Sequence, residues 1–396
     1  MKKSIIIYLI ILFSIESVSS QNTNIGKVYI NPDTVVSFVD DFKNTNTGEF
    51  WNNGSVYAYS DWNNDGIVDF SLFSINSGLT NFAGTETQII SGTSFNYFYN
   101  GLFDNTQGTI AFDLQGNISI TNESDFVLGI IDNKSSNGMF VFEQNADHIG
   151  ASDASHINGA VIKMGDNSFD YPIGNSNYYR SAAISAPSIE TDTFTGEYFF
   201  EDTNIQYPIN NLGANITLID NAEYWVIESS NESSQVYLTL SWNTETTPNE
   251  VLINPLESIH IARWNNVLQS WVDQGGVQDI SNQSVSALVE SYGVFTLARV
   301  KNDNKEIDFP LFLTPNGDGF YDTWNVHPSE NIEIITIHIF DRYGKLLKQI
   351  GPNSIGWDGT FNGKLLPSND YWFVVNYKDL DDNTIRPYRS HFTLKH

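Results

Sequence analysis

Residues 25–165 consist of short segments in which apolar and polar residues alternate, separated by turns rich in asparagine and glycine. Alternation places one side of an extended segment in a core and the other in solvent, so it predicts strands rather than helices. Gly and Asn tolerate positive φ, and Asn, Asp and Ser bond back to their own backbone, which favours tight turns. The clearest strand segments are residues 55–59, 67–70, 108–112, 117–120 and 138–142.

The turns in this region recur every 8 to 20 or so residues, without a strict period. Such spacing is typical of the irregular coils of a parallel β-helix, in which each coil stacks on the last and one continuous core results. A β-sandwich is the competing interpretation, because spacing alone does not exclude it. For residues 21–165 we therefore predict a β-rich body that is either a parallel β-helix or a sandwich.

Longer, aromatic-rich alternating segments follow in residues 166–300, for example 224–227, 236–242, 259–264 and 293–298. Wide alternating strands of this kind favour an antiparallel β-sandwich. The polar stretch 301–308 lacks apolar periodicity and is interpreted as a linker. Residues 309–396 again alternate and predict a third, small β-domain. The fold class is therefore all-β.

The N-terminus has the organisation of a secretory signal peptide. Lys2 and Lys3 form a basic start, residues 5–13 are an unbroken apolar run, and Val18 and Ser20 precede the expected cleavage point. The apolar run is too short to span a bilayer, which needs about 20 residues. We predict removal of residues 1–20. The chain has no cysteine, which excludes disulfides and a lipidated cysteine at the new N-terminus.

The charge of the chain excludes one class of partner. The sequence has 47 Asp and Glu against 19 Lys and Arg, and residues 21–308 hold 36 of the acidic residues but only nine of the basic ones. Such a body repels phosphate backbones, so we expect no binding to nucleic acid. The acidity suits solubility outside the cell, and some of the carboxylates could hold calcium.

Five separate motifs organise the last 88 residues. They are the run 309–319 (FPLFLTPNGDG), 341–345 (DRYGK), 356–359 (GWDG), 362–364 (NGK) and 371–375 (YWFVV), and the chain stops at 391–396 (HFTLKH). Their order and spacing resemble the gliding-motility-associated C-terminal domain, the type B sorting domain of the type IX secretion system. The resemblance implies an Ig-like β-sandwich that directs export across the outer membrane, with the type IX secretion machinery as partner and the cell surface or medium as destination.

The resemblance also carries over a set of signature positions. They are Asn316, Gly317, Asp318, Gly319, Asp322, Trp357, Asp358, Gly359, Asn362, Gly363 and Tyr371. The Gly, Asn and Asp residues are expected to fix turns, and the two aromatic residues to pack the sandwich. Two positions depart from the family pattern: Tyr321 stands where a small polar residue is expected, and His396 replaces a final Arg or Lys.

One segment of the body has the spacing D-x-N-x-D-G-x-x-D, in which oxygen ligands at alternating positions and a glycine at the bend can wrap one calcium ion. The candidate ligands are Asp61, Asn63, Asp65, the Ile67 carbonyl and Asp69. The acid expected at the twelfth position is absent, because Leu72 stands there. The competing interpretation is a plain hairpin turn.

The same spacing recurs at residues 314–322, with Thr314 in the first position. Asn316, Asp318 and Asp322 are therefore weaker calcium candidates. For hydrolytic chemistry, the sequence contains no G-x-S-x-G, no H-E-x-x-H and no cysteine nucleophile.

We expect a non-enzymatic, adhesin-like or structural surface protein, associated with gliding. The first alternative is a carbohydrate-binding protein that contacts a surface polysaccharide or another extracellular ligand. Strand tryptophans could stack on sugars, although core packing is their more frequent use. The candidates are Trp225, Trp242, Trp264 and Trp271. The second alternative is a polysaccharide-degrading enzyme on a β-helix.

Overall fold

The structure is a computed structural model that describes residues 21–71, 78–108, 110–254, 256–301, 307–328, 332–352, 354–380 and 383–396. These residues contain no α-helix, only strands, turns and two short 3-10 helices, η1 (Thr203–Ile205) and η2 (Leu256–Ser258), which confirms the all-β prediction. Within the same residues, no helix has the length and apolar character needed to cross a bilayer. The predicted signal peptide, residues 1–20, and residues 302–306 of the predicted linker lie outside the described residues.

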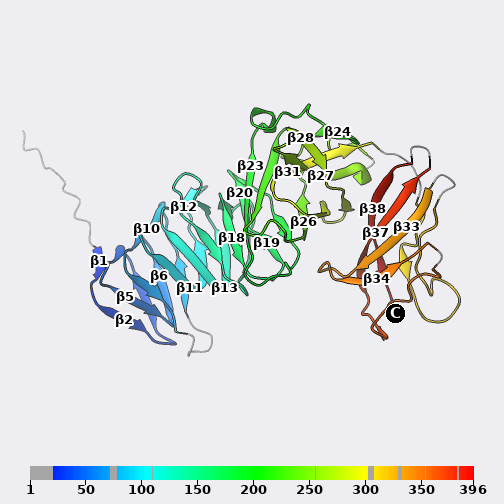
Figure 1. Ribbon diagram of the computed structural model, residues 1–396. Coiled ribbons are helices and arrows are strands. Elements are labelled where there is room, and N and C mark those ends of the chain that lie inside the picture. Colours follow the sequence, from blue (N-terminus) through cyan, green and yellow to red (C-terminus); the bar gives the residue numbers. More distant parts are fainter. Residues whose placement is uncertain are drawn as a thin grey trace, which may run out of the picture.

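The N-terminal half winds into a parallel β-helix whose coils stack along one axis, drawn from blue to green in Figure 1. Strands of successive coils pair in parallel, which confirms the β-helix rather than the sandwich for this region. Its strands lie on three faces, and a typical coil contributes one strand to each face. Because every strand pairs with the coils before and after it, the interior becomes one continuous apolar column.

Face one contains β1 (Gln21–Asn24), β4 (Asp41–Asn44), β7 (Trp62–Asn64), β10 (Gln88–Ser91), β12 (Ile110–Leu114), β14 (Ile130–Asp132), β17 (Ile157–Asn158) and β20 (Ile173–Asn175), closed by antiparallel β21 (Tyr178–Tyr179). Face two contains β2 (Lys27–Ile30), β5 (Glu49–Asn52), β8 (Ile67–Asp69), the first parts of β11 (Phe95–Asp104) and β13 (Asn117–Leu128), β15 (Phe140–Phe142) and β18 (Val161–Met164). Face three contains β3 (Val35–Phe38), β6 (Ser55–Ala58), β9 (Leu79–Phe82), the second parts of β11 and β13, and β16 (Asp147–Ile149).

One corner of the β-helix is held by a ladder of buried asparagines. The Asn24 amide donates to Asn44 Oδ1 at 2.9 Å, and the Asn44 amide donates to Asn64 Oδ1 at 2.8 Å. The Asn64 amide continues to the carbonyl oxygen of Phe95, at 2.9 Å. The backbone bends at this corner and leaves groups that no strand can pair. The ladder supplies the missing partners inside the core.

Aromatic rings fill the column behind the strands. Trp62 and Phe82 lie 5.9 Å apart between ring centroids, Phe82 and Phe103 stack at 5.5 Å, and Phe103 and Phe126 stack at 5.9 Å. All four side chains are buried. Each such pair adds roughly 0.5–1.5 kcal/mol beyond its burial, so the stacking fastens one coil to the next.

The β-helix passes directly into an antiparallel region, because β18 pairs with β23 in antiparallel fashion. One sheet continues through β23 (Thr193–Phe200), β25 (Glu223–Ser229), β31 (Gly293–Val300), β27 (Ile259–Asn265) and β28 (Ser270–Asp273), with β24 (Ile216–Ile219) also on β31. The facing sheet has the order β19 (Phe169–Tyr171), β22 (Ala182–Ile184), β26 (Val236–Ser241), β30 (Ser284–Val289) and β29 (Val277–Asp279). A single core cluster runs from the β-helix into this sandwich, so the two bodies share one interior.

The described residues of the C-terminal domain form a separate core and seven strands, at the right of Figure 1. A five-stranded sheet has the order β32 (Phe312–Leu313), β38 (Ile385–Leu394), β37 (Asn369–Asp379), β33 (Ile332–Phe340) and β34 (Leu346–Ile350), and a hairpin joins β35 (Thr360–Phe361) to β36 (Lys364–Leu365). Trp324 covers this sheet, stacking on Phe392 with ring centroids 4.2 Å apart. A pair of backbone hydrogen bonds links Trp324 to Trp357. The arrangement agrees with the expected small sandwich.

Candidate functional site

The loop that opens the C-terminal domain closes on a single carboxylate. Asp322 accepts hydrogen bonds from the backbone N–H groups of Gly317 and Gly319, each at 2.7 Å, one on each carboxylate oxygen. Both glycines have positive φ, 79° and 89°, a conformation that a side chain would strain. The signature residues Gly317, Gly319 and Asp322 therefore fix the shape of one compact loop.

Two further signature residues cross-link the same loop. The Asn316 side chain donates to Asp318 Oδ2 at 2.9 Å, and Asp318 Oδ1 accepts from the N–H of Phe320 at 2.8 Å. The hydrogen bond from Phe320, followed by that from Asn316, lowers the pKa of Asp318 below its usual value. The loop thus satisfies its own polar groups, and it is shaped before it meets any partner.

The outer surface of this loop is apolar. Phe320 is 73% exposed and Leu311 is 69% exposed. Phe312 and Tyr321 are also exposed and pack against each other, with ring centroids 4.6 Å apart. Tyr321, the departure from the family pattern, adopts positive φ and adds to this apolar surface. Exposed apolar groups gathered on a rigid loop are typical of a contact surface for another protein.

The second group of signature residues builds the turn after Trp357. The Trp357 side chain is fully buried, and its indole N–H donates to the carbonyl of Thr360 at 2.8 Å. Asp358 accepts from the N–H and the hydroxyl of Thr360, and the hydroxyl bond is the first cause of the lowered pKa of Asp358. Gly359 has positive φ, which would strain any side chain, and a Cβ added to it would lie 3.1 Å from the side chain of Leu394.

The remaining signature residues complete this hairpin and its support. Asn362 and Gly363 both have positive φ, 51° and 73°, and form the two-residue connection between β35 and β36. Tyr371 is buried, and its hydroxyl donates to the carbonyl of Pro367 at 2.9 Å. As the family resemblance implies, polar signature residues shape turns while Trp357 and Tyr371 pack the core.

The calcium candidates of the β-helix lie around one corner, on two faces. Asp61 Oδ1 accepts the N–H of Ile89 at 2.8 Å, and Asp65 Oδ1 accepts the N–H and hydroxyl of Thr93 at 3.1 and 3.0 Å. Asp69 follows on β8. Within the described residues, no three His, Cys, Asp or Glu side chains converge as a metal site. A cation here would therefore depend on amide and carbonyl oxygens, and calcium stays a prediction.

The remaining ligand candidates of that run follow the same pattern. Asn63 donates to the hydroxyl of Ser91 at 3.0 Å, and the backbone carbonyl of Ile67 accepts from the Asn44 amide at 2.9 Å. Ile67 itself presents its side chain to solvent. The run thus bonds mainly to the coils on either side. The weaker candidates Asn316, Asp318 and Asp322 bond within their own loop, as described above.

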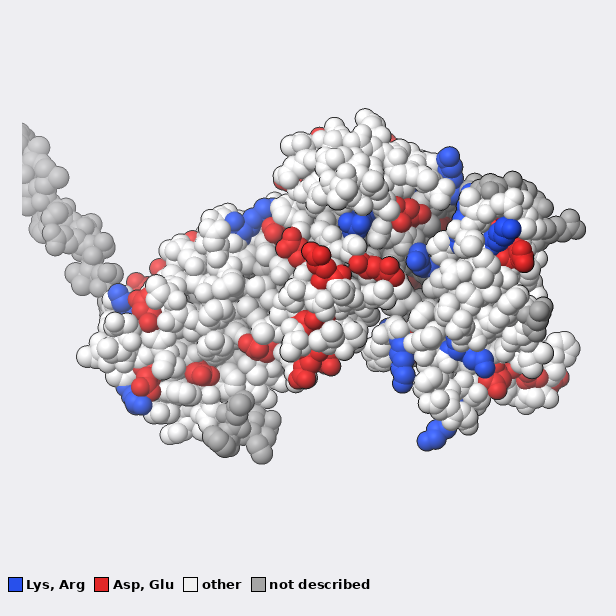
Figure 2. All heavy atoms as spheres, in the orientation of Figure 1, with Lys and Arg blue, Asp and Glu red and all other residues white. Residues whose placement is uncertain are grey.

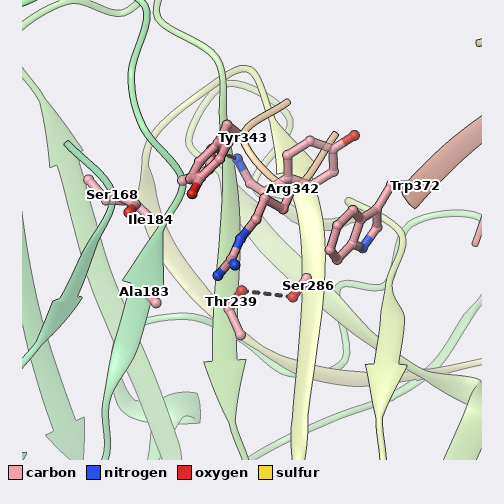
Figure 3. Close-up of a pocket in the computed structure, with 10 residues that line it drawn as sticks. Ser168, Ala183, Ile184, Thr239, Ser286, Arg342, Tyr343 and Trp372 are labelled. Atoms are coloured by element: carbon pink, nitrogen blue, oxygen red, sulfur yellow. Dashed lines mark hydrogen bonds between the residues drawn. The ribbon is translucent and has the colours of Figure 1, made fainter. Parts of the chain in front are cut away.

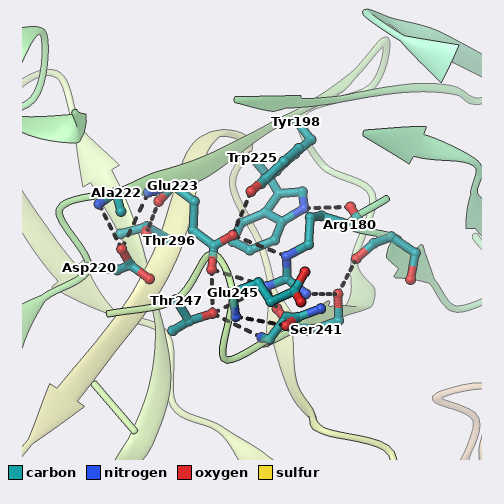
Figure 4. A network of polar contacts seen from close by, with 12 residues as sticks. Arg180, Tyr198, Asp220, Ala222, Glu223, Trp225, Ser241, Glu245, Thr247 and Thr296 are labelled. Atoms are coloured by element: carbon teal, nitrogen blue, oxygen red, sulfur yellow. Dashed lines mark hydrogen bonds and ion pairs between the residues drawn. The ribbon is translucent and has the colours of Figure 1, made fainter. Parts of the chain in front are cut away.

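A buried ionic network lies where the β-helix meets the sandwich (Figure 4). Arg180 is 3% exposed and binds Glu223, which is fully buried, through two hydrogen bonds of 3.1 and 3.0 Å. Tyr198 and Thr247 donate their hydroxyls to the same carboxylate at 2.6 and 2.5 Å. Removing one partner of such a pair costs about 3–5 kcal/mol, because the other charge stays buried. The network fixes the junction.

Asp220 lies beside this network and has a different electrostatic character. Its Oδ1 accepts the N–H groups of Ala222 and Glu223, at 2.8 and 3.3 Å, while its Oδ2 is buried without a partner among the described residues. Burial, and then the charge of Glu223, raises the pKa of Asp220 well above its usual value. Compared with the unfolded chain, the folded protein therefore holds the proton of Asp220 to a higher pH.

Sequence reasoning missed both of these groups, because neither has a local motif. Arg180 and Glu223 are 43 residues apart, and only the fold brings them together. The asparagine ladder did carry a signal that could have been found, namely Asn24, Asn44 and Asn64 at intervals of 20 residues.

Comparison with known proteins assigns the C-terminal domain. Residues 307–392 match the family model described as the CHU_C type IX secretion signal domain. No curated protein and no solved structure matches the chain. The matched segment contains the closed loop, the Trp357 turn and Tyr371, and its presence implies contact with the type IX secretion machinery. Residues 307–392 are therefore a type IX secretion signal domain, matching the sorting domain of type B cargo proteins, and this domain indicates export to the cell surface or the extracellular space.

Proposed function

We propose that this exported protein is a non-enzymatic, adhesin-like surface protein, and that face two of its β-helix makes the contact. The observation that carries the proposal is a set of outward-facing aromatic side chains on β2, β5 and β11 of that face. This aromatic face consists of Tyr29, Trp51, Phe95 and Tyr97. It belongs to a parallel sheet that runs along the β-helix, which suits contact over a broad surface.

The rings of the aromatic face are nearly parallel. Tyr29 and Trp51 are opposite each other on β2 and β5, with ring centroids 6.0 Å apart and planes inclined by 12°. Phe95 and Tyr97 on β11 have centroids 5.7 Å apart and an inclination of 24°. Tyr29 is 57% and Tyr97 is 42% exposed. Strand pairing already orders the backbone that carries these rings, so its ordering adds no entropy cost when they bind a partner.

Carbohydrate binding is the second candidate, and the same rings favour it. Parallel rings on a rigid sheet offer flat apolar surfaces to the faces of sugar rings, while neighbouring polar groups can bond to hydroxyls. The four tryptophans considered for this role from the sequence are buried, at most 4% exposed, and serve the core instead; they are Trp225, Trp242, Trp264 and Trp271. Sugar contact by the β-helix would therefore depend on Trp51 and its neighbours.

Adhesion of a type IX-competent host that displays the protein tests the proposal. We expect the double variant Trp51→Ala, Tyr97→Ala to lower retention in a flow chamber at least tenfold, with surface display verified by antibody labelling. Tyr59→Ala is the matched control, since Tyr59 is 44% exposed but lies outside the aromatic face. Equal retention of the wild type and the double variant would refute the proposal. A glycan array with the same variants separates a carbohydrate ligand from other surfaces.

A further inference from the structure

A cleft opens between the sandwich and the sorting domain (Figure 3). Its volume is about 170 Å³, below the roughly 300–1,000 Å³ typical of drug-sized ligands, so it has room for one small ring. The sandwich contributes side chains from β22, β26 and β30, and the sorting domain contributes Arg342, Tyr343 and Trp372. A ligand in this cleft would contact both domains at once.

Hydroxyl groups line the sandwich side of the cleft. The Thr239 and Ser286 hydroxyls are hydrogen-bonded at 2.7 Å, and Ser185 Oγ accepts the N–H of Tyr237 at 2.9 Å. The Tyr237 hydroxyl is buried and has no hydrogen-bond partner among the described residues. Burial raises the pKa of Tyr237 to about 12, so this hydroxyl is protonated at neutral pH and can donate. A polyhydroxylated ligand would supply the acceptor that it lacks.

A rigid turn presents the cationic side of the cleft. Asp341 Oδ1 accepts the N–H groups of Tyr343 and Lys345, both at 2.9 Å, and Gly344 has positive φ. The turn packs closely on the sandwich, because a Cβ added to Gly344 would lie 3.3 Å from the Tyr237 ring. This contact fixes the position from which the residue between Asp341 and Tyr343 reaches into the cleft.

That residue is Arg342. Among the described residues, no hydrogen bond or ion pair engages its guanidinium, which lies 5.4 Å from the centroid of the Tyr343 ring. Figure 3 shows the side chain directed toward the strand of Thr239. Its planar donor fork is therefore free for a ligand, and that geometry matches a carboxylate.

The charges of the sorting domain suit an anion better than those of the rest of the molecule. Residues 309–396 carry eight basic and ten acidic residues, against nine and 36 in residues 21–308. On the face drawn in Figure 2, Lys and Arg gather over the sorting domain, and Asp and Glu form a band over the middle of the molecule. An anionic ligand would thus meet less repulsion at Arg342 than elsewhere.

We propose that this cleft binds one uronic acid, a sugar ring that carries a carboxylate. The guanidinium of Arg342 would hold the carboxylate in a bidentate pair, Trp372 or Tyr343 would cover the ring, and the hydroxyls of Tyr237, Thr239 and Ser286 would bond to the sugar hydroxyls. The site is separate from the aromatic face, so each can fail without the other. Binding would also tie the sorting domain to its cargo.

Calorimetric titration of the full chain, beginning at Gln21, with galacturonate tests this proposal. We expect Arg342→Gln to weaken binding at least tenfold, and Lys364→Gln, which removes an exposed charge outside the cleft, to leave it unchanged. Galactose lacks the carboxylate and acetate lacks the sugar ring. Each should therefore bind at least tenfold more weakly than galacturonate. Comparison of the monosaccharide with trigalacturonate then distinguishes a free acid from the end of a polysaccharide chain.

Three results would overturn the uronic acid site. They are the absence of galacturonate binding, equal binding by wild type and Arg342→Gln, and equal affinity for galacturonate and acetate. Thermal unfolding of each variant checks that the substitution leaves the fold intact. Tyr237→Phe is a second variant that removes only one hydroxyl from the cleft, and we expect a loss of at least threefold.

Discussion

The asparagine ladder makes a strong prediction about local stability. Asn44 is fully buried, and its side chain bonds to Asn64 Oδ1, to the carbonyl of Ile67 and to the Asn24 amide. Asn44→Ala removes these three hydrogen bonds from the core, although Asn64 Oδ1 still accepts the N–H of Gly66 and the Asn24 amide still donates to the carbonyl of Glu49. A hydrogen bond contributes a net of about 1 kcal/mol, so the loss of the three together costs about 3 kcal/mol. Since about 1.4 kcal/mol is a factor of ten, local opening should become about 100-fold more frequent.

Hydrogen–deuterium exchange resolved by peptide measures this effect where it arises. In the Asn44→Ala protein, amides in β4, β5 and β7 should exchange about 100-fold faster, while those of the sorting domain should be unchanged. Asn46→Ala is the matched control, because Asn46 lies in the same turn but is exposed. Asn44→Asp keeps the size of the side chain but removes both donor hydrogens, so it should resemble Asn44→Ala.

Two results would refute this reasoning. If Asn44→Ala changed exchange by less than threefold, the ladder would contribute nothing beyond what water supplies to the opened corner. If Asn44→Asp retained full protection, the volume of the side chain, and not its hydrogen bonds, would hold the coils together.

Two further predictions concern titration and cations. Because the folded pKa of Asp220 is raised above its ordinary value of 3.8, the carboxyl group stabilises the fold at acid pH, and this contribution is lost as pH rises above about 4. The melting temperature of Asp220→Asn should therefore rise relative to that of the wild type as pH increases. The control is Glu232→Gln, because Glu232 is exposed. Parallel profiles of melting temperature against pH for Asp220→Asn and the wild type would contradict this prediction. For calcium, Asp61 and Asp65 already accept backbone N–H groups, so titration of the chelator-treated protein should give a dissociation constant no tighter than about 10⁻³ M. A micromolar constant that is lost in Asp65→Asn would show a calcium site that displaces those hydrogen bonds.

Alternation and turn chemistry were sufficient to predict an all-β chain, because both act over a few residues. To distinguish a β-helix from a sandwich, the sequence would need to show a repeat as long as one coil. The coils keep a constant length only at the beginning of the β-helix. Face-one strands begin at Gln21, Asp41 and Trp62, but the next begins at Gln88. Longer corners interrupt the repeat, and the ladder then changes its chemistry from an asparagine amide to the carbonyl of Phe95. Pairing between coils tolerates such insertions, whereas a search for a fixed interval does not.

The sorting-domain signature could be read from the sequence because each of its turns is local. Asp322 lies three to five residues from the N–H groups it accepts, and Asn362 with Gly363 forms a complete two-residue turn. The buried pair of Arg180 and Glu223 had no such local signal. A charged residue next to aromatic strands is indistinguishable in sequence from an exposed one until its distant partner is placed.

The two D-G runs show why one spacing can predict different chemistry. Oxygen atoms at alternating positions before a bend converge on whatever positive group lies inside the bend. That group can be a cation or a set of backbone N–H groups. At residues 314–322 the donors are the loop's own Gly317 and Gly319, which Asp322 binds. At residues 61–69 the donors include those of the next coil, through Ile89 and Thr93. In both runs the carboxylates compensate for backbone groups that a sharp turn leaves unpaired. A cation can bind in either run only if its gain exceeds the loss of those hydrogen bonds, so affinity rather than spacing decides between the two roles.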